Sequence, residues 1–296
     1  MDPDLVFSLV ALISYISLVL LLVPIRYDHI LVIGGYSLLL LMKRYKFTKD
    51  LSPFLFVWLF YDGMAIFTDN VSQRVQGKEI YDLDVFLFGK FFNGEAPPIW
   101  FYQNERIFLV TAITGILYLA YIFIPIIIAL VLWLKRENPI YYRLYWELSL
   151  TFLLVTILAV ITFYLYPCAP PWYYVENGFS NPLTEVHPDS AQLQDVDDFL
   201  GIPIFRLFYS FESNPFAAFP SLHVAYPILT ALIWKKIKPK RSYLAWLFPI
   251  GVAFSAVYLN HHWVTDGLAA IIYTLVSYKI VQLIVKRQFT EETNLG

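Results

Sequence analysis

The stretch Phe219-Pro220-Ser221-Leu222-His223 opens one long apolar segment, and His261-His262-Trp263-Val264-Thr265-Asp266 lies just before another. Each stretch is therefore placed where a membrane helix meets water. A histidine at such a boundary contributes nothing to spanning a membrane. Two of them, one followed by a carboxylate four residues later, indicate phosphoryl-transfer chemistry at a membrane surface. The rest of the chain is interpreted as the frame that brings them together.

The composition is that of a membrane protein. Of the 296 residues, 58% are hydrophobic and only 15% are charged, whereas about 25% of residues are charged in soluble domains. The apolar residues form runs of membrane-spanning length, so we expect an all-α, polytopic membrane helical bundle. The single Cys168 excludes an internal disulfide and a thiolate metal cluster.

About eight transmembrane helices are expected in a single integral membrane domain. The predicted segments lie near residues 5–24, 28–42, 51–68, 107–134, 144–166, 217–234, 242–261 and 265–285. The second is short for a span of about 20 residues, and Asp62 interrupts the third. The first follows Asp2 and Asp4 rather than a basic region and lacks a small-residue cleavage site, so it is expected to be a retained helix.

Three regions are distinguished within this domain. We expect N-terminal helices in residues 1–68, an external amphipathic loop in 69–106 and a catalytic helical core in 107–287. The first long loop has apolar residues at helical spacing among acidic ones, which favours an interfacial helix. In the second, which runs from Pro167 to about residue 216, Ser190 is placed to cap a short helix.

The basic residues predict the orientation in the membrane. Most of the 21 lysines and arginines lie in the loops that eight crossings place on one side. Those residues are Lys43, Arg44, Lys46, Lys49, Lys135, Arg136, Arg143, Lys235, Lys236, Lys238, Lys240, Arg241, Lys279, Lys286 and Arg287. An excess of this kind marks the cytoplasmic face. We therefore expect cytoplasmic termini and both histidine stretches on the external or lumenal face.

Both histidine stretches contain partners for phosphoryl transfer. His262 and Asp266 are four residues apart, so at the start of a helix they share a face, and the carboxylate can orient the imidazole. The alternative is that Asp266 only begins the helix. Pro220 suits a helix start, where free N–H groups and the Ser221 hydroxyl can bind an anion and His223 can donate a proton. The alternative there is a simple N-terminal cap.

Together, the two stretches resemble a known family. Pro220-Ser221-x-His223 followed by His262-x-x-x-Asp266 resembles the type-2 phosphatidic acid phosphatase (PAP2) superfamily, and Ser255 falls on the serine of its third motif. Residues 166–173, Gly201-Ile202-Pro203 and Ala218-Phe219-Pro220 are similar to the branch that contains inositol phosphorylceramide synthase.

The resemblance implies a six-helix core and a role for each matching residue. His262 would be the nucleophile that forms a phosphohistidine, Asp266 would orient it, and His223 would be the general acid and base. Ser221 and Ser255 would bind phosphate, without a metal or another cofactor. Trp172 and Tyr173, in the aromatic loop after the fifth segment, are candidate substrate-binding residues that would restrict water. Membrane lipids would be the substrates, and no nucleic-acid partner is expected.

The chain also departs from the family pattern. The arginine of the third motif is Ala256 here, and the Lys-six-Arg-Pro motif is absent where the fifth segment ends. Fewer cations suit a phosphodiester better than a phosphate dianion. Candidates to replace them are Arg74, Lys90, Arg106 and Arg206.

The sequence therefore predicts a lipid phosphotransferase that moves a phosphorylated head group, with inositol phosphate as a candidate, to a lipid alcohol. A PAP2-type lipid phosphate or polyprenyl diphosphate phosphatase remains open, as do a membrane transporter and a scaffolding membrane protein. The oligomeric state is not predicted.

Overall fold

The regular elements of this protein are helices. The computed structural model describes residues 1–23, 25–64, 74–104, 106–179, 191, 193–210 and 214–294. Within these residues, extended pairing is limited to two isolated bridges, which join Cys168 to Gln76 and to Ala217. The predicted all-α fold is confirmed.

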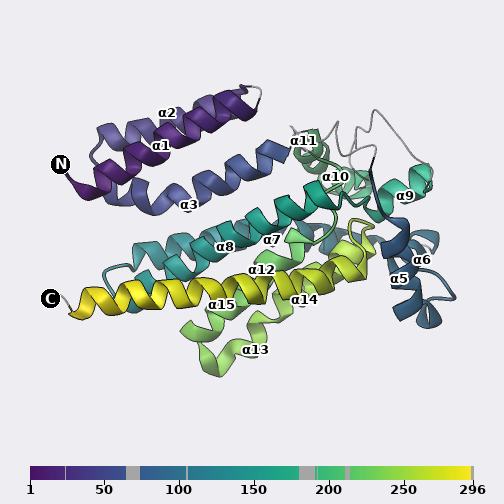
Figure 1. Cartoon of the computed structure of the whole chain (residues 1–296). Helices are drawn as coiled ribbons and strands as arrows, with labels where there is room; N and C mark the ends of the chain where they lie inside the picture. Colours follow the sequence, from purple (N-terminus) through teal and green to yellow (C-terminus); the bar gives the residue numbers. More distant parts are fainter. Residues whose placement is uncertain are drawn as a thin grey trace.

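The helices follow one another along the whole chain (Figure 1). They are α1 (Pro3–Leu22), α2 (Tyr27–Leu41), α3 (Tyr45–Asp62), α5 (Lys78–Phe88), η2 (Gly89–Phe91), α6 (Pro97–Gln103), α7 (Phe108–Leu134), α8 (Pro139–Leu165), α9 (Pro171–Asn177), α10 (Gln194–Leu200), α11 (Ile204–Ser210), α12 (Leu222–Ile237), η3 (Pro239–Arg241), α13 (Ser242–Ala245), α14 (Leu247–Tyr258) and α15 (Val264–Asn294).

Helices occupy all eight predicted segments, and their lengths differ. Among the described residues, four stretches are long and apolar enough to cross a membrane: Pro3–Leu21, Phe108–Leu134, Pro139–Leu165 and Val264–Arg287. α2 has 15 residues and α12 has 16. At about 1.5 Å per residue, each is shorter than a hydrocarbon core of about 30 Å. The fold is a polytopic membrane bundle, and the count of eight crossings remains a prediction.

The seventh segment, predicted as one helix over 242–261, is divided in two. α13 ends at Ala245, and α14 begins at Leu247. Pro249 has no N–H to donate to the carbonyl of Ala245, four residues earlier, so the helical hydrogen bonding is interrupted there. The fifth segment begins earlier than predicted, because the Asn138 side chain accepts a 2.9 Å hydrogen bond from the N–H of Ile140 and caps α8.

α12 is the central helix of the bundle. It packs against α7, α8, α14 and α15 (Figure 1). Every residue from Val224 to Ala231 is buried, as expected for a helix that is covered on all sides. This packing holds the N-terminal end of α12, with Ser221 and His223, in the middle of one end of the bundle.

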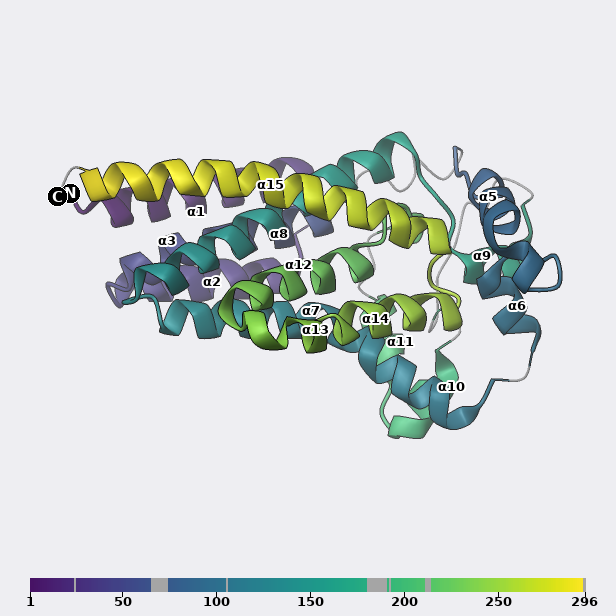
Figure 2. The ribbon, with the colours of Figure 1, turned by 90° about the horizontal axis from the view of Figure 1, so that it is seen from below.

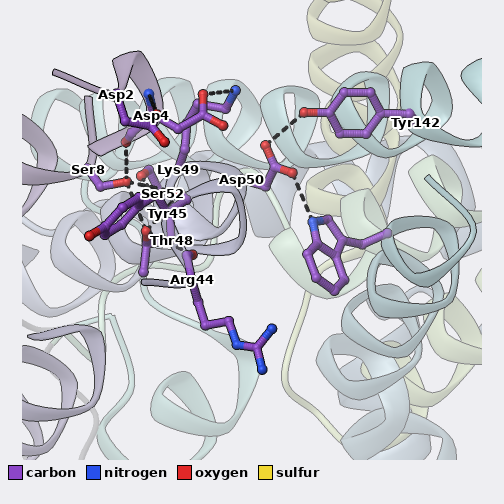
Figure 3. Close-up of polar contacts among 11 residues, drawn as sticks. Asp2, Asp4, Ser8, Arg44, Tyr45, Thr48, Lys49, Asp50, Ser52 and Tyr142 are labelled. Atoms are coloured by element: carbon purple, nitrogen blue, oxygen red, sulfur yellow. Dashed lines mark hydrogen bonds and ion pairs between the residues drawn. The ribbon is translucent and has the colours of Figure 1, made fainter. Parts of the chain in front are cut away.

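α1, α2 and α3 form a group that we call the three-helix unit. It lies along one side of the bundle and joins it through α3, which packs against α8 (Figure 1). Near the start of α3, the Asp50 carboxylate accepts 2.9 Å hydrogen bonds from the Tyr142 hydroxyl and the Trp133 indole N–H (Figure 3). These bonds fasten the unit to α7 and α8.

The long loops gather at the end of the molecule opposite the termini. Figure 2 shows both termini at one end and α5, α6, α9, α10 and α11 towards the other. α5 confirms the helix predicted within 69–106, although residues 65–73 lie outside the described part of the chain. α10 is the short helix predicted after Pro167, and Ser190, its predicted cap, also lies outside the described residues.

Candidate active site

The structure brings the two histidine stretches into contact. His223 lies in the first turn of α12, and His262 lies in the connection between α14 and α15. Nδ1 of His223 is 3.0 Å from Nε2 of His262, and Nδ1 of His262 is 3.2 Å from Oδ2 of Asp266. One carboxylate and two imidazoles therefore form a continuous chain of polar contacts.

The connection that carries His262 is shaped by a helix-terminating turn. Asn260 has a φ of 67° and ends α14 in the left-handed region, which asparagine tolerates better than most residues. The next two N–H groups, of His261 and His262, donate to the carbonyl of Ala256 at 2.9 and 3.0 Å. The chain reverses within a few residues, and the His262 ring is placed beside the start of α12.

Asp266 is held by the first turn of its own helix. Its Oδ2 also accepts a 2.9 Å hydrogen bond from the N–H of Trp263, and the side chain is fully buried. The backbone N–H of Ser221 donates to the carbonyl of Asp266 at 3.2 Å. The beginnings of α12 and α15 are thus joined directly, which fixes the two halves of the site relative to one another.

Burial keeps the imidazole of His262 neutral. The side chain is almost inaccessible to solvent, and burial lowers its pKa to about 3, because a charged ring loses hydration there. Burial also lowers the pKa of His261, with His262 and Arg106 adding to the effect. Around pH 7, His262 therefore has a lone pair available on a ring nitrogen.

The two serines have different surroundings. The Ser221 hydroxyl is buried and has no hydrogen-bond partner within the described part of the chain. The Ser255 hydroxyl, in α14, donates to the carbonyl of Gly251 at 2.8 Å. The start of α12 therefore presents an unused donor beside His223, whereas Ser255 already makes a bond within its own helix. Phosphate binding by either serine remains a prediction.

A cavity of about 410 Å³ opens beside the histidines. Its wall includes His223, His261 and His262, several aromatic side chains of α3, α7 and α12, and Trp172. Tyr173 is buried and lines a second cavity of about 150 Å³ with Trp263. Of the two predicted substrate-binding residues, Trp172 therefore reaches the histidine cavity, and the binding role of both stays a prediction.

Charged residues of the three-helix unit also line the histidine cavity. They are Arg26, Asp28 and Asp62. Sequence reasoning noticed Asp62 only as a charge that interrupts an apolar segment, and Arg26 only as a basic residue outside the cytoplasmic loops. The signal was present in both cases, but its meaning depends on how the three-helix unit packs.

The four predicted replacement cations have other surroundings. Among the residues described as lining this cavity, none of them appears. Arg74 donates to the carbonyl of Tyr164 at 3.2 Å, and Arg206 donates to Oε1 of Gln194 at 2.6 Å. Lys90 lies over the Phe91 ring, and Arg106 lies near the Tyr258 ring. Which cation contacts a phosphate remains a prediction for all four.

Comparison with known proteins agrees with this geometry. The model of the PAP2 superfamily matches residues 93–280, which include every residue of the histidine–carboxylate chain. The chain belongs to the PAP2 superfamily.

Relatives within the PAP2 superfamily are synthases. The phosphoinositol dihydroceramide synthase of Bacteroides thetaiotaomicron is 30% identical over 86% of this chain and 84% of its own length. The catalytic subunit of inositol phosphorylceramide synthase from Saccharomyces cerevisiae is 32% identical over 43% of this chain and 31% of its own length. The corresponding subunit from Schizosaccharomyces pombe is 25% identical over 45% of this chain and 31% of its own length. No solved structure matches significantly.

Apolar helices and PAP2 membership together define the broad class. The protein is an integral membrane enzyme of the PAP2 phosphotransferase type. The structure also accommodates its departure from the PAP2 pattern at Ala256. That residue is fully buried, and its carbonyl is the acceptor that ends α14.

Proposed function

We propose that this protein transfers a phosphorylated head group from a phospholipid to a lipid alcohol through a phosphohistidine on His262. The observation that carries the proposal is the chain of contacts from Asp266 through His262 to His223 beside a cavity of head-group size. Phosphoinositol is the proposed head group and a ceramide-type alcohol the proposed acceptor, because the printed names of its relatives specify them.

In the first proposed step, Nε2 of His262 attacks the phosphorus and the bond from phosphorus to the glycerolipid oxygen breaks. Asp266, 3.2 Å from Nδ1, stabilises the positive charge that the ring gains. His223 gives its proton to the departing oxygen. The donor phosphate takes the place of the direct contact between the histidines, and its negative charge favours the protonated form of His223.

In the second proposed step, the lipid alcohol gives its proton to His223 and its oxygen attacks the phosphorus. The bond from phosphorus to His262 breaks, and both histidines return to their starting protonation states. Ser221, with its unused buried hydroxyl, would donate to a phosphoryl oxygen together with the free N–H groups at the start of α12. Ser255 would assist from α14.

We propose that both termini are cytoplasmic and that the site lies on the external or lumenal face. The distribution of basic residues supports this orientation. The structure adds that both termini lie at one end of the molecule, with α5, α6 and α9 at the other (Figure 2). An even number of crossings gives this arrangement. Residues 107–287 would form the catalytic core of a single domain.

A transfer assay tests the proposal. Purified protein in vesicles is given phosphatidylinositol labelled in its inositol ring, with or without dihydroceramide. We expect labelled inositol phosphate on the ceramide, in excess of water-soluble inositol phosphate, because a lipid alcohol is positioned in the membrane plane while aromatic side chains restrict water. Exclusive hydrolysis, or release of phosphate from lipid phosphates only, would instead identify a phosphatase that uses the same residues.

A further inference from the structure

The three-helix unit contributes a compact charged cluster to the cavity of the catalytic histidines. We call Arg26, Asp28, His29 and Asp62 the α2–α3 cluster, because they come from the start of α2 and the end of α3. Three of the four line the cavity that His223 and His262 also line. One continuous space therefore extends from the reacting nitrogen to this cluster.

Hydrogen bonds hold the α2–α3 cluster in one arrangement. Nε and Nη2 of Arg26 donate to the two oxygens of Asp28 at 3.1 and 2.9 Å. Nη2 also lies 2.6 Å from Oδ1 of Asp62, whose Oδ2 is 2.7 Å from Nε2 of His29. The side chains of Asp62 and His29 are 4% and 0% exposed, while those of Arg26 and Asp28 are 33% and 26% exposed. The inner pair supports an outer pair that faces the cavity.

Folding alone gives little reason for these charges. Charged groups within membrane helices are expensive, and partnered ones in such positions are usually functional. Replacing a buried ion pair with apolar residues of similar volume is often neutral or stabilising. The three-helix unit is also joined to the bundle at its other end through Asp50. The cluster is therefore better explained by a ligand than by stability.

The chemistry of the α2–α3 cluster selects among possible ligands. Two carboxylates against one guanidinium disfavour a phosphate, which leaves the phosphate at the histidines. A metal ion is disfavoured because Nη2 of Arg26 already bridges Asp28 and Asp62. An ammonium group is disfavoured because both carboxylates are paired with that same guanidinium. Hydroxyl groups, which donate and accept, match a surface where guanidinium donors alternate with carboxylate acceptors.

We propose that the α2–α3 cluster binds the hydroxyl groups of a polyol head group while its phosphate lies at the histidines. The inference rests on the proposed head-group transfer and adds the residues that select the head group. A cavity of about 410 Å³ falls in the range of small-ligand sites, about 300–1,000 Å³. Arg26 and Asp28 are specificity-determining residues in this assignment, and Asp62 and His29 position them.

The test compares donors that differ only in head group. Transfer to dihydroceramide is measured with phosphatidylinositol and with phosphatidylethanolamine of the same acyl chains, for the wild type, Arg26→Gln and Asp28→Asn. Asp4→Asn is the matched control, because Asp4 pairs with Lys49 at the other end of the same three-helix unit (Figure 3). We expect the wild type and the control to prefer the inositol lipid. Each cluster variant should lower the ratio of kcat/KM values about tenfold or more, mainly through KM, since hydrogen bonds to charged groups are lost.

A binding measurement keeps the inference testable if a variant is inactive. Thermal unfolding of the detergent-solubilised wild type is followed with myo-inositol 1-phosphate and, separately, with inorganic phosphate. We expect greater stabilisation by the inositol phosphate, and no difference between the two ligands in Asp28→Asn.

The outcomes separate this inference from the proposed function. An unchanged donor ratio in both cluster variants, with active transfer, overturns polyol recognition and leaves head-group transfer standing. A wild-type preference for the ethanolamine lipid that both variants lose overturns it in favour of an ammonium ligand. Absence of transfer from every donor refutes the proposed function, and equal stabilisation by the two phosphates then also overturns the inference.

Discussion

The carboxylate of Asp84, in the external helix α5, accepts a 2.8 Å hydrogen bond from the backbone N–H of Val264, the first residue of α15. Its second oxygen accepts a 3.0 Å bond from the N–H of Thr265. Asp84 is fully buried, and burial raises the pKa of its carboxyl, while the two hydrogen bonds oppose that shift. A segment 180 residues away in sequence thus caps the helix that carries Asp266.

Replacing Asp84 with asparagine should weaken both the fold and the site. The amide has only one acceptor oxygen, so one N–H of α15 loses its partner and the favourable charge at the helix start disappears. We expect a loss of about 1–2 kcal/mol in stability and reduced transfer, measured as thermal unfolding in detergent and as kcat. Asp82→Asn, on the exposed side of the same helix, is the control. Equal effects of the two variants would remove the capping role.

The proposed roles of the histidines predict different defects. His262→Ala should lower transfer by about 10³-fold or more and leave no acid-labile phosphoenzyme, because the nucleophile is gone. His223→Ala should lower transfer from a lipid donor by about 10²–10⁴-fold. That loss should shrink with a nitrophenyl phosphodiester, whose leaving group needs no proton. Appreciable turnover by His262→Ala would exclude the phosphohistidine.

Stability should fall as the medium becomes acidic. The pKa of an unfolded histidine is about 6.5, while burial lowers that of His262 to about 3. Between these values the unfolded chain binds a proton that the folded chain excludes. The stability from this neutral ring is complete above pH about 6.5 and is lost as the pH falls through the window, by at most about 1.4 kcal/mol per pH unit for one group.

Thermal unfolding measured between pH 7.5 and 4.5 checks this dependence. The variant His262→Gln should show a shallower slope than the wild type, with the remainder due to other buried histidines such as His261, whose pKa is also lowered. Identical slopes would mean that His262 is already protonated in the folded protein.

The proposed orientation predicts which loops meet the outside. In a Cys168→Ala background, an impermeant maleimide on intact cells should label a cysteine at position 82 and leave one at position 238 unlabelled until the membrane is permeabilised. Asp82 and Lys238 are both exposed in the structure, so accessibility within the protein does not confound the result. Labelling of position 238 alone would reverse the orientation.

The sequence predicted those parts of the molecule that depend on local spacing. Apolar runs located the helices, and the four-residue spacing placed His262 beside Asp266. The interruption at Trp246 was missed although Pro249 was visible, because proline is also tolerated within α12 as Pro227 and within α7 as Pro125. In the wrong prediction for residues 242–261, hydrophobicity outweighed a local hydrogen-bonding constraint.

The missed features depend on contacts between distant segments. The pairing of Arg26 with Asp62 requires that α2 and α3 pack with their outer ends together, and the bond from Val264 to Asp84 requires that α5 lie over α15. Neither arrangement follows from helical periodicity, which says which face is apolar and not which neighbour covers it. A charge within an apolar segment, such as Asp62, was the signal that pointed beyond spanning.

Asp50 fastens the three-helix unit to α7 and α8 near one end of α3, whereas the histidine cavity separates the unit from the bundle near the other end, at Trp58 and Asp62. A two-chain lipid diffusing in the bilayer meets such an arrangement from the side. We therefore expect the rate to follow the mole fraction of donor in the membrane and not its amount per volume of water. Dilution with inert lipid should slow turnover, while extra donor-free vesicles should leave it unchanged, so that membrane composition itself regulates the supply of substrate.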